Sequence, residues 1–168
     1  MSRQSDLAEL AGNNFNGDAI LVDAAGHVTK PLQPSFSCIP ASTQSNISLN
    51  ADVTIVWGTE ITDIGGNFAS NVFTAPVTGK YQFSFCVSMR AIDSAANYYE
   101  AKLLSSNRAY RIIFDPDFGQ DSFAWSLQMS VLADMDTGDT ASVILAQVAG
   151  TAQTDISVES WFTGTLIS

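Results

Sequence analysis

The chain has 168 residues, of which 46% are hydrophobic and only 14% are charged, and its formal net charge is −10. This composition excludes a disordered chain, and the length suits one domain with a short appendage. The seven Lys and Arg residues are scattered, so the sequence predicts no binding to nucleic acid, whose phosphates need clustered cations. No apolar run approaches the roughly 18 residues of a membrane-spanning helix, and we expect neither membrane insertion nor a secretory leader.

Residues 1–34 differ from the rest of the chain and are predicted to form an extended arm rather than a domain. Residues 6–11 suit one or two helical turns, which the Gly and Asn residues at positions 12–17 would end. Residues 19–22 form a short apolar run that suits a strand and needs a partner surface. Two interpretations stay open, a frayed terminus and an arm that anchors the protein or clasps its subunits.

Residues 35–168 are predicted to form one all-β domain of short strands separated by turns. The clearest two-residue period places Tyr81, Phe83 and Phe85 on one side of a strand and polar residues on the other. The expected strands cover residues 35–39, 53–57, 81–88, 98–104, 110–114, 126–132, 141–148 and 158–167. Many short strands at this spacing predict a two-sheet antiparallel sandwich or jelly roll.

The two cysteines, Cys38 and Cys86, each lie within a predicted strand. Two cysteines in a chain of this length are not a disulfide framework. They are either two small buried apolar residues or one structural disulfide, and the sequence leaves both readings open.

One short stretch carries a specific motif, in which an aromatic residue is followed by five residues, a glycine and then alternating aromatics. Its members are Phe73, Gly79, Tyr81, Phe83 and Phe85. The motif resembles the signature of the globular-head domain of complement component one q, in the superfamily that includes tumour necrosis factor. Such a domain is a jelly roll without catalytic activity.

Three further patches extend this resemblance in chain order. Asp63 and Phe68 keep the family's upstream spacing, although the gap from Phe68 to the motif is slightly shorter than usual, which affects a loop. Residues 135–139 resemble the family's penultimate turn, and residues 160–167 resemble its closing strand. The resemblance therefore spans about residues 35–168.

The resemblance implies a homotrimer around a threefold axis, with the last strand near the centre of the jelly roll. Trp57, Trp125 and Trp161 are then either core residues or residues that face the axis. We expect Gly79 to supply a positive φ between two strands, with Pro76 stiffening the approach, and Gly164 to mark a close backbone approach.

The residues that catalysis needs are absent or isolated. The only histidine is His27, in the arm, and no nucleophile, phosphate-binding or zinc motif is present, so we predict that the chain is not an enzyme and has no cofactor. Two acidic groups flank turns, Asp115, Asp117 and Asp121 in one and Asp134, Asp136 and Asp139 in the other. They are either solvated turn residues or calcium ligands, and calcium is the metal we assign to Asp134, Asp136 and Asp139.

Three functions compete. The first is a trimeric virion surface protein of a bacteriophage, a capsid decoration protein or fibre head, which binds capsid or tail proteins through the arm. Its loops around Asp93, 115–121 and 150–155 would face outward, toward a glycan or protein of the host surface. The second is an extracellular complement-like, cytokine-like or lectin-like ligand. The third is an enzyme on a jelly-roll frame, which would need a metal or a pair of carboxylates.

Overall fold

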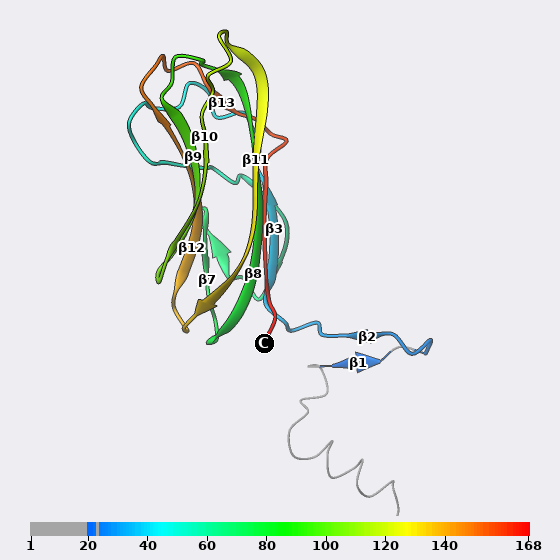
Figure 1. Ribbon diagram of the computed structural model, residues 1–168. Helices are drawn as coiled ribbons and strands as arrows, with labels where there is room; N and C mark the ends of the chain where they lie inside the picture. Colours follow the sequence, from blue (N-terminus) through cyan, green and yellow to red (C-terminus); the bar gives the residue numbers. More distant parts are fainter. Residues whose placement is uncertain (1–19, 23) are drawn as a thin grey trace, which may run out of the picture.

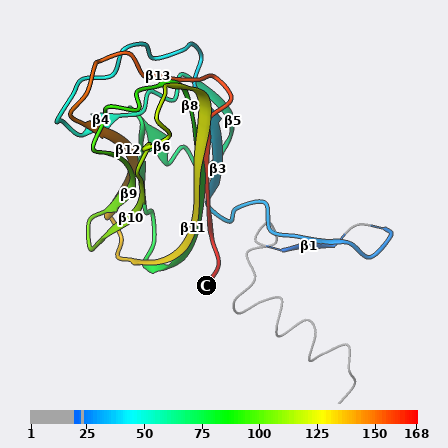
Figure 2. The ribbon, with the colours of Figure 1, turned by 45° about the horizontal axis from the view of Figure 1, so that its top comes forward.

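The computed structural model describes residues 20–22 and 24–168 and shows two antiparallel sheets stacked face to face (Figures 1 and 2). The described residues contain strands, turns and loops but no helix, and none of them forms a segment that could cross a membrane as a helix. The helical turns predicted for residues 6–11 lie outside the described residues. The all-β, two-sheet fold that the sequence predicts is confirmed.

The first sheet, called here the β8 sheet, is built around the strand of the aromatic motif. Its strands, in spatial order, are β11 (Ser122–Met135), β8 (Gly79–Ile92), β14 (Trp161–Leu166), β3 (Ser35–Ile39) and β5 (Thr59–Ile64), with β13 (Asp155–Ile156) pairing with β8. The closing strand β14 therefore lies at the centre of this sheet, as the resemblance implied.

The second sheet, called the β9 sheet, lies opposite. Its strands, in spatial order, are β10 (Ala109–Phe114), β9 (Tyr98–Ser105), β12 (Thr140–Val148), β7 (Val72–Thr74) and β6 (Phe68–Ala69), with β4 (Val53–Thr54) pairing with β12. The strand predicted at 53–57 is thus only two residues long, although Ile55 and Trp57 are buried as its alternation required.

The core between the sheets is aromatic because the two-residue period points one side of each strand inward. Tyr81, Phe83 and Phe85 of β8 are almost completely buried. Phe36 joins the two sheets, since its ring lies 5.0 Å from that of Phe73 and 4.8 Å from that of Phe162, centroid to centroid. Such ring pairs add to the free energy gained by apolar burial.

Two glycines are required by close packing rather than by backbone conformation. The expectation of a positive φ at Gly79 is wrong, because Gly79 begins β8 with an ordinary φ. A Cβ there would lie 2.5 Å from the carbonyl oxygen of Ser168 and 2.7 Å from Leu166 Cδ1, so only glycine fits beside the C-terminus. At Gly164 the close approach is confirmed, but aromatic rings rather than backbone make it: a Cβ would collide with Phe36 and lie 2.6 Å from Phe83 Cδ1.

The two cysteines are free and buried, and they point to opposite faces of the β8 sheet. Cys38 lies in the core, whereas Cys86 follows Phe85 on β8 and points outward beside Trp161 of β14. The structure therefore decides between the two readings of the sequence in favour of separate buried thiols.

The arm enters the domain from one end, called here the base, where the C-terminus also lies (Figure 1). Its strands β1 (Leu21–Val22) and β2 (Val28–Thr29) pair as a small antiparallel ribbon that extends away from the sandwich. The strand expected within residues 19–22 is confirmed in its second half.

Candidate self-association surface

The outward face of the β8 sheet is covered in its middle by uncharged side chains, many of them Ser and Thr, and we call it the neutral face. Ser84 and Ser130 share a hydrogen bond of 2.7 Å between their hydroxyls, and Gln82 Nε2 donates to Ser130 Oγ at 2.7 Å. Thr163 Oγ1 donates to the Ser84 carbonyl oxygen at 3.4 Å. Because these polar groups bond to one another, the face can lose water without leaving unpaired charges.

The centre of the neutral face is a shallow hollow beside Trp161. Its volume is about 280 Å³, and its lining includes Ser84, Gln128, Ser130 and Trp161. The strand register sets Trp161 opposite Cys86. Cys86 is only 5% exposed, and burial is the main cause of the raised pKa of its thiol. The hollow presents an indole and small hydroxyls, a surface suited to an apolar or aromatic partner side chain.

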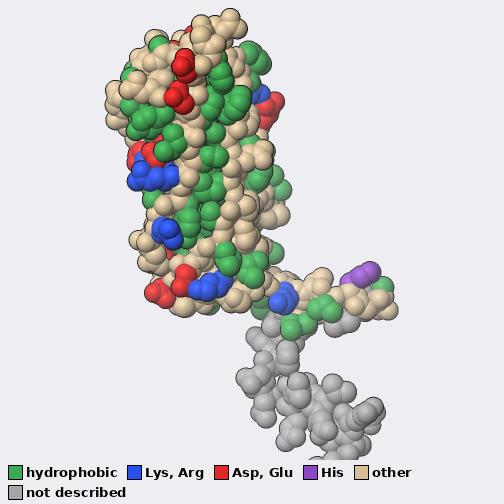
Figure 3. Space-filling view, in the orientation of Figure 1, with side chains coloured by type: hydrophobic (Ala, Val, Ile, Leu, Met, Phe, Trp, Pro, Cys, Tyr) green, Lys and Arg blue, Asp and Glu red, His purple; other side chains and the backbone are tan. Residues whose placement is uncertain are grey.

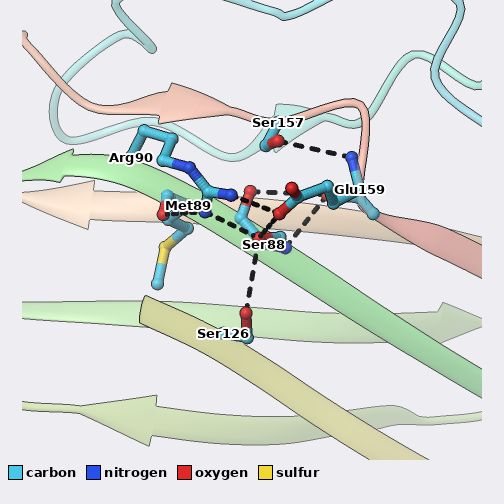
Figure 4. Close-up of polar contacts among 7 residues, drawn as sticks. Ser88, Met89, Arg90, Ser126, Ser157 and Glu159 are labelled. Carbon is cyan, nitrogen blue, oxygen red and sulfur yellow. Dashed lines mark hydrogen bonds and ion pairs between the residues drawn. The ribbon is translucent and has the colours of Figure 1, made fainter. Parts of the chain in front are cut away.

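The middle of β8, β11 and β14 is uncharged, and charges stand at the two ends of the neutral face and on the edge strand β5. Toward the loops, Arg90 pairs with Glu159 and donates from Nη1 to Ser88 Oγ at 3.0 Å (Figure 4). Ser126 Oγ donates to the same Ser88 hydroxyl at 3.4 Å. At the base, Lys80 pairs with Asp134 at 2.7 Å. Each cation is matched by a carboxylate, so the face carries little net field.

A second apolar surface runs along the edge where β10 and β11 meet, and we call it the aromatic edge. Phe114 and Trp125 stack with centroids 4.6 Å apart and planes 9° apart, and Phe118 packs 5.5 Å from Phe114. Phe118 is 44% exposed, Trp125 is 42% exposed and Phe123, which lines the same shallow hollow, is 82% exposed. Figure 3 shows hydrophobic side chains running down the molecule between β10 and β11. Contiguous exposed apolar surface of this kind marks an interaction site.

The structure joins the three loops that the sequence predicted to face outward, at the end of the sandwich opposite the base. Asp121 accepts hydrogen bonds from Gln153 Nε2 at 2.9 Å and from the Ser94 amide at 2.9 Å, and these bonds lower the pKa of its carboxyl. The carboxylate of Asp93 is buried between these loops and accepts hydrogen bonds from the amides of Ala95 and Thr151. Asp93 and Asp121 therefore hold the loops together.

The acidic turn predicted for calcium places its carboxylates with separate protein partners. Asp134 pairs with Lys80, Asp136 accepts from Thr78 Oγ1 at 3.4 Å, and Asp139 accepts from the Asp136 amide at 2.9 Å. No group of three or more His, Cys, Asp or Glu among the described residues is arranged to hold a metal ion. Calcium at this turn stays a prediction that these contacts do not support.

Sequence reasoning missed the aromatic edge and the Arg90–Glu159 pair. The signal for the edge was present, because β11 continues its alternation upstream to Phe123 and Trp125, beyond the strand predicted at 126–132. The pair joins β8 to the segment before β14, 69 residues apart, and no local pattern reports such a contact.

The two stacked antiparallel sheets define a jelly-roll domain. The sequence profile of the C1q domain matches residues 36–167, so the chain belongs to the C1q domain family. Domains of this family are typically non-enzymatic binding modules.

Solved structures agree on the fold. The globular domain of the zebrafish complement 1qA protein is 19% identical, with a TM-score of 0.60 over 81% of this chain and 98% of its own. Murine APRIL, crystallised at pH 8.5, is 13% identical, with a TM-score of 0.56 over 80% of this chain and 99% of its own. No curated protein matches the chain.

Proposed function

We propose that the chain is the head of a non-enzymatic binding protein that works as a trimer. In this proposal the aromatic edge of one copy packs against the neutral face of the next. The observation that carries it is the exposed aromatic edge, where Phe123 is 82% exposed, Phe118 44% and Trp125 42%. A soluble single copy rarely leaves a contiguous surface of this kind in water.

Two different surfaces on one chain favour a ring rather than a two-fold dimer. A contact between two unlike surfaces repeats from one copy to the next, and it forms a closed ring when the rotations between neighbouring copies add up to a full turn. The neutral face supplies the hollow beside Trp161, and the aromatic edge supplies side chains of matching character. Membership of the C1q domain family, whose members are typically trimeric, favours closure at three copies.

Ligand recognition is assigned to the loop end, away from the base. The segments 93–97, 115–121 and 149–154 meet there through Asp93 and Asp121. A rigid frame that presents short joined loops suits recognition of a protein or glycan. An extracellular complement-like, cytokine-like or lectin-like ligand is therefore the function that we favour, in line with the structures that share the fold.

The second candidate is a head fixed by its arm to a larger body, such as the capsid or tail of a bacteriophage. The observation that favours it is the ribbon β1–β2, which extends from the base on the side away from the ligand loops (Figure 1). Deleting residues 1–30 would then leave a soluble trimer that no longer attaches to its particle. Continued attachment of the shortened protein would remove this candidate.

Charge insertion tests the proposed assembly. Ser84→Arg places a cation in the neutral face, where an interface would leave it without a partner. Ser142→Arg is the matched control, because Ser142 is equally half-buried but points outward from the β9 sheet. We expect light scattering to report single copies for S84R and trimers for S142R and the unchanged chain. Equal masses for all three proteins would reject the neutral face as an interface.

A further inference from the structure

An apolar groove lies at the base of the domain. Its volume is about 560 Å³, and its apolar lining comes from Leu32, Pro34, Pro76, Val77, Leu166 and Ile167. Three of these side chains are unusually open, with Leu32 58%, Val77 45% and Ile167 51% exposed. The groove lies outside both the neutral face and the aromatic edge.

The walls of this groove are fixed by backbone hydrogen bonds. The Leu166 amide donates to the Pro34 carbonyl at 2.9 Å, and the Ile167 amide donates to the Lys80 carbonyl at 2.7 Å. The Lys80 amide returns a bond of 2.7 Å to the Ser168 carbonyl. The groove is therefore formed in advance, and an occupant need not order it.

The ribbon β1–β2 is the complementary part of the same chain. Ile20 is 39% exposed, Leu21 is 44% exposed and Val28 is 63% exposed. Leu21 pairs with Thr29 in a ladder of only two residue pairs. An isolated two-stranded ribbon is at best marginally stable in water, so these side chains need a surface to pack on.

The ribbon is poorly placed to fill the groove of its own copy. Residues 30–34 join the ribbon to β3, and four of these five residues also line the groove. Pro31 and Pro34 restrict this connection to extended conformations. For the ribbon to reach the groove of its own copy, the connection of residues 30–34, which forms part of the groove wall, would have to reverse its direction. Figures 1 and 2 both show the ribbon leading away from the sandwich.

We propose that the groove at the base receives the β1–β2 ribbon of a second copy of this chain. Each copy offers one apolar groove and one apolar ribbon, and exchange around a ring covers all of them. The inference rests on the proposed self-association only in that another copy must be present. It gives the arm the role of a clasp between subunits.

Cross-linking between two single-cysteine variants tests the proposal. Leu21→Cys and Val77→Cys chains with different tags are co-expressed and treated with a short bis-maleimide. The native thiols interfere little, because both are buried and their pKa values are raised. Val56→Cys replaces V77C as the matched control, since Val56 is similarly exposed, at 50%, but does not line the groove.

The proposal predicts a covalent pair that carries both tags for L21C with V77C, and only background for L21C with V56C. A cross-link confined to single copies of the L21C/V77C double variant would show that the ribbon fills its own groove, which overturns the proposal. Absence of any specific cross-link also overturns it. Light scattering of the same samples separates this proposal from the proposed trimer. Trimers without a cross-link would reject the ribbon exchange alone, whereas single copies without a cross-link would reject both.

Hydrogen exchange gives an independent readout of the ribbon. Val77→Asp places a charge in the groove, so amides of residues 20–29 should exchange about tenfold faster in V77D than in the unchanged chain. Val56→Asp should leave these amides unchanged. If V77D folds normally, equal exchange rates in all three proteins would contradict the proposal.

Discussion

The outward faces of the two sheets differ in a way that the shared core does not explain. The neutral face of the β8 sheet carries Ser and Thr around Trp161. The outward face of the β9 sheet holds an ion network, in which Glu100 lies between Lys102, at 3.1 Å, and Arg111, at 3.0 Å. Lys102 also reaches Asp52 at 2.8 Å.

This difference favours the neutral face as the one that meets another subunit in the proposed trimer. Charges near water are cheap to keep, whereas charges in a close contact must be desolvated and matched. The chain places charges on the β9 sheet, at the ends of the β8 sheet and on its edge strand β5, and leaves β14 and the middle of β8 and β11 uncharged. Substitutions on each face test whether the two faces differ in this way.

The largest expected effect comes from the residue beneath the neutral face. Gly164→Ala forces a methyl group against Phe36 and Phe83, and we expect the free energy of unfolding to fall by about 3 kcal/mol. Ser84→Ala, on the same face but pointing outward, should change it by less than about 0.5 kcal/mol. Urea denaturation of both variants checks this. A neutral effect of G164A would contradict the close packing of β14 on the core.

The next effect separates assembly from stability. Trp161→Ala should weaken association by about 2 kcal/mol, as loss of a central aromatic anchor does. Tyr98→Ala removes a half-buried aromatic from the outward face of the β9 sheet and should leave association unchanged. Sedimentation equilibrium measures both. Equal weakening by the two variants would remove the distinction between the faces.

Substitutions in the ion network of the β9 sheet should lower stability without changing association. Glu100→Gln leaves Lys102 and Arg111 beside a neutral amide, and because the side chain of Glu100 is only 7% exposed, we expect a loss of about 2 kcal/mol in stability. Asp52→Asn, at an exposed carboxylate, should cost less than about 1 kcal/mol. Neither variant should change the copy number. Dissociation of the trimer by E100Q would indicate an interface on the β9 sheet and contradict the proposed one on the β8 sheet.

The buried thiol of Cys38, on the inward side of the β8 sheet, predicts that the stability of the fold falls at alkaline pH. Burial, followed by the carboxylates of Glu60 and Asp63, raises the pKa of Cys38 from 9.0 to about 12. As the pH rises, the unfolded chain loses the Cys38 proton before the folded chain does. The contribution of Cys38 to the free energy of unfolding is therefore fully present below pH 9 and is lost as pH rises toward 12, by at most about 1.4 kcal/mol per pH unit.

Thermal denaturation of the unchanged chain and of Cys38→Ala between pH 8 and about pH 11 measures this slope. The variant should begin less stable but decline less steeply. Burial also raises the pKa values of Tyr81 and Tyr99, so some slope should remain in C38A. Identical slopes would show that Cys38 does not stay protonated in the folded chain.

The smallest effect is expected from calcium. Asp134, Asp136 and Asp139 already bind Lys80, Thr78 and a backbone amide. Millimolar calcium should therefore shift the melting temperature by less than about 1 °C, since only preferential binding to the folded state stabilises it. A rise that EDTA reverses and D136N abolishes would restore the calcium prediction.

The fold was largely predictable because its signals are local. The alternation at Tyr81, Phe83 and Phe85 marks β8, and the motif around Gly79 gives the family, although the reason for Gly79 is its contact with Ser168 rather than its φ. Strands β5, β6 and β7 were missed, because an exposed edge strand and two very short strands carry little periodic signal.

The candidate surface was less predictable because it is assembled from distant strands. The serines of β8 and β11 read as ordinary polar positions until their register sets Ser84 beside Ser130. Likewise, Trp161 could equally be a core or a surface residue until β14 was placed between β8 and β3.

The most direct measurement is the mass of the unchanged chain in solution as it is diluted through the micromolar range. We expect sedimentation equilibrium to give three times the 17.9 kDa chain mass, and S84R to give a single copy. A mass of one chain for the unchanged protein throughout that range would contradict the assembly of aromatic edge on neutral face.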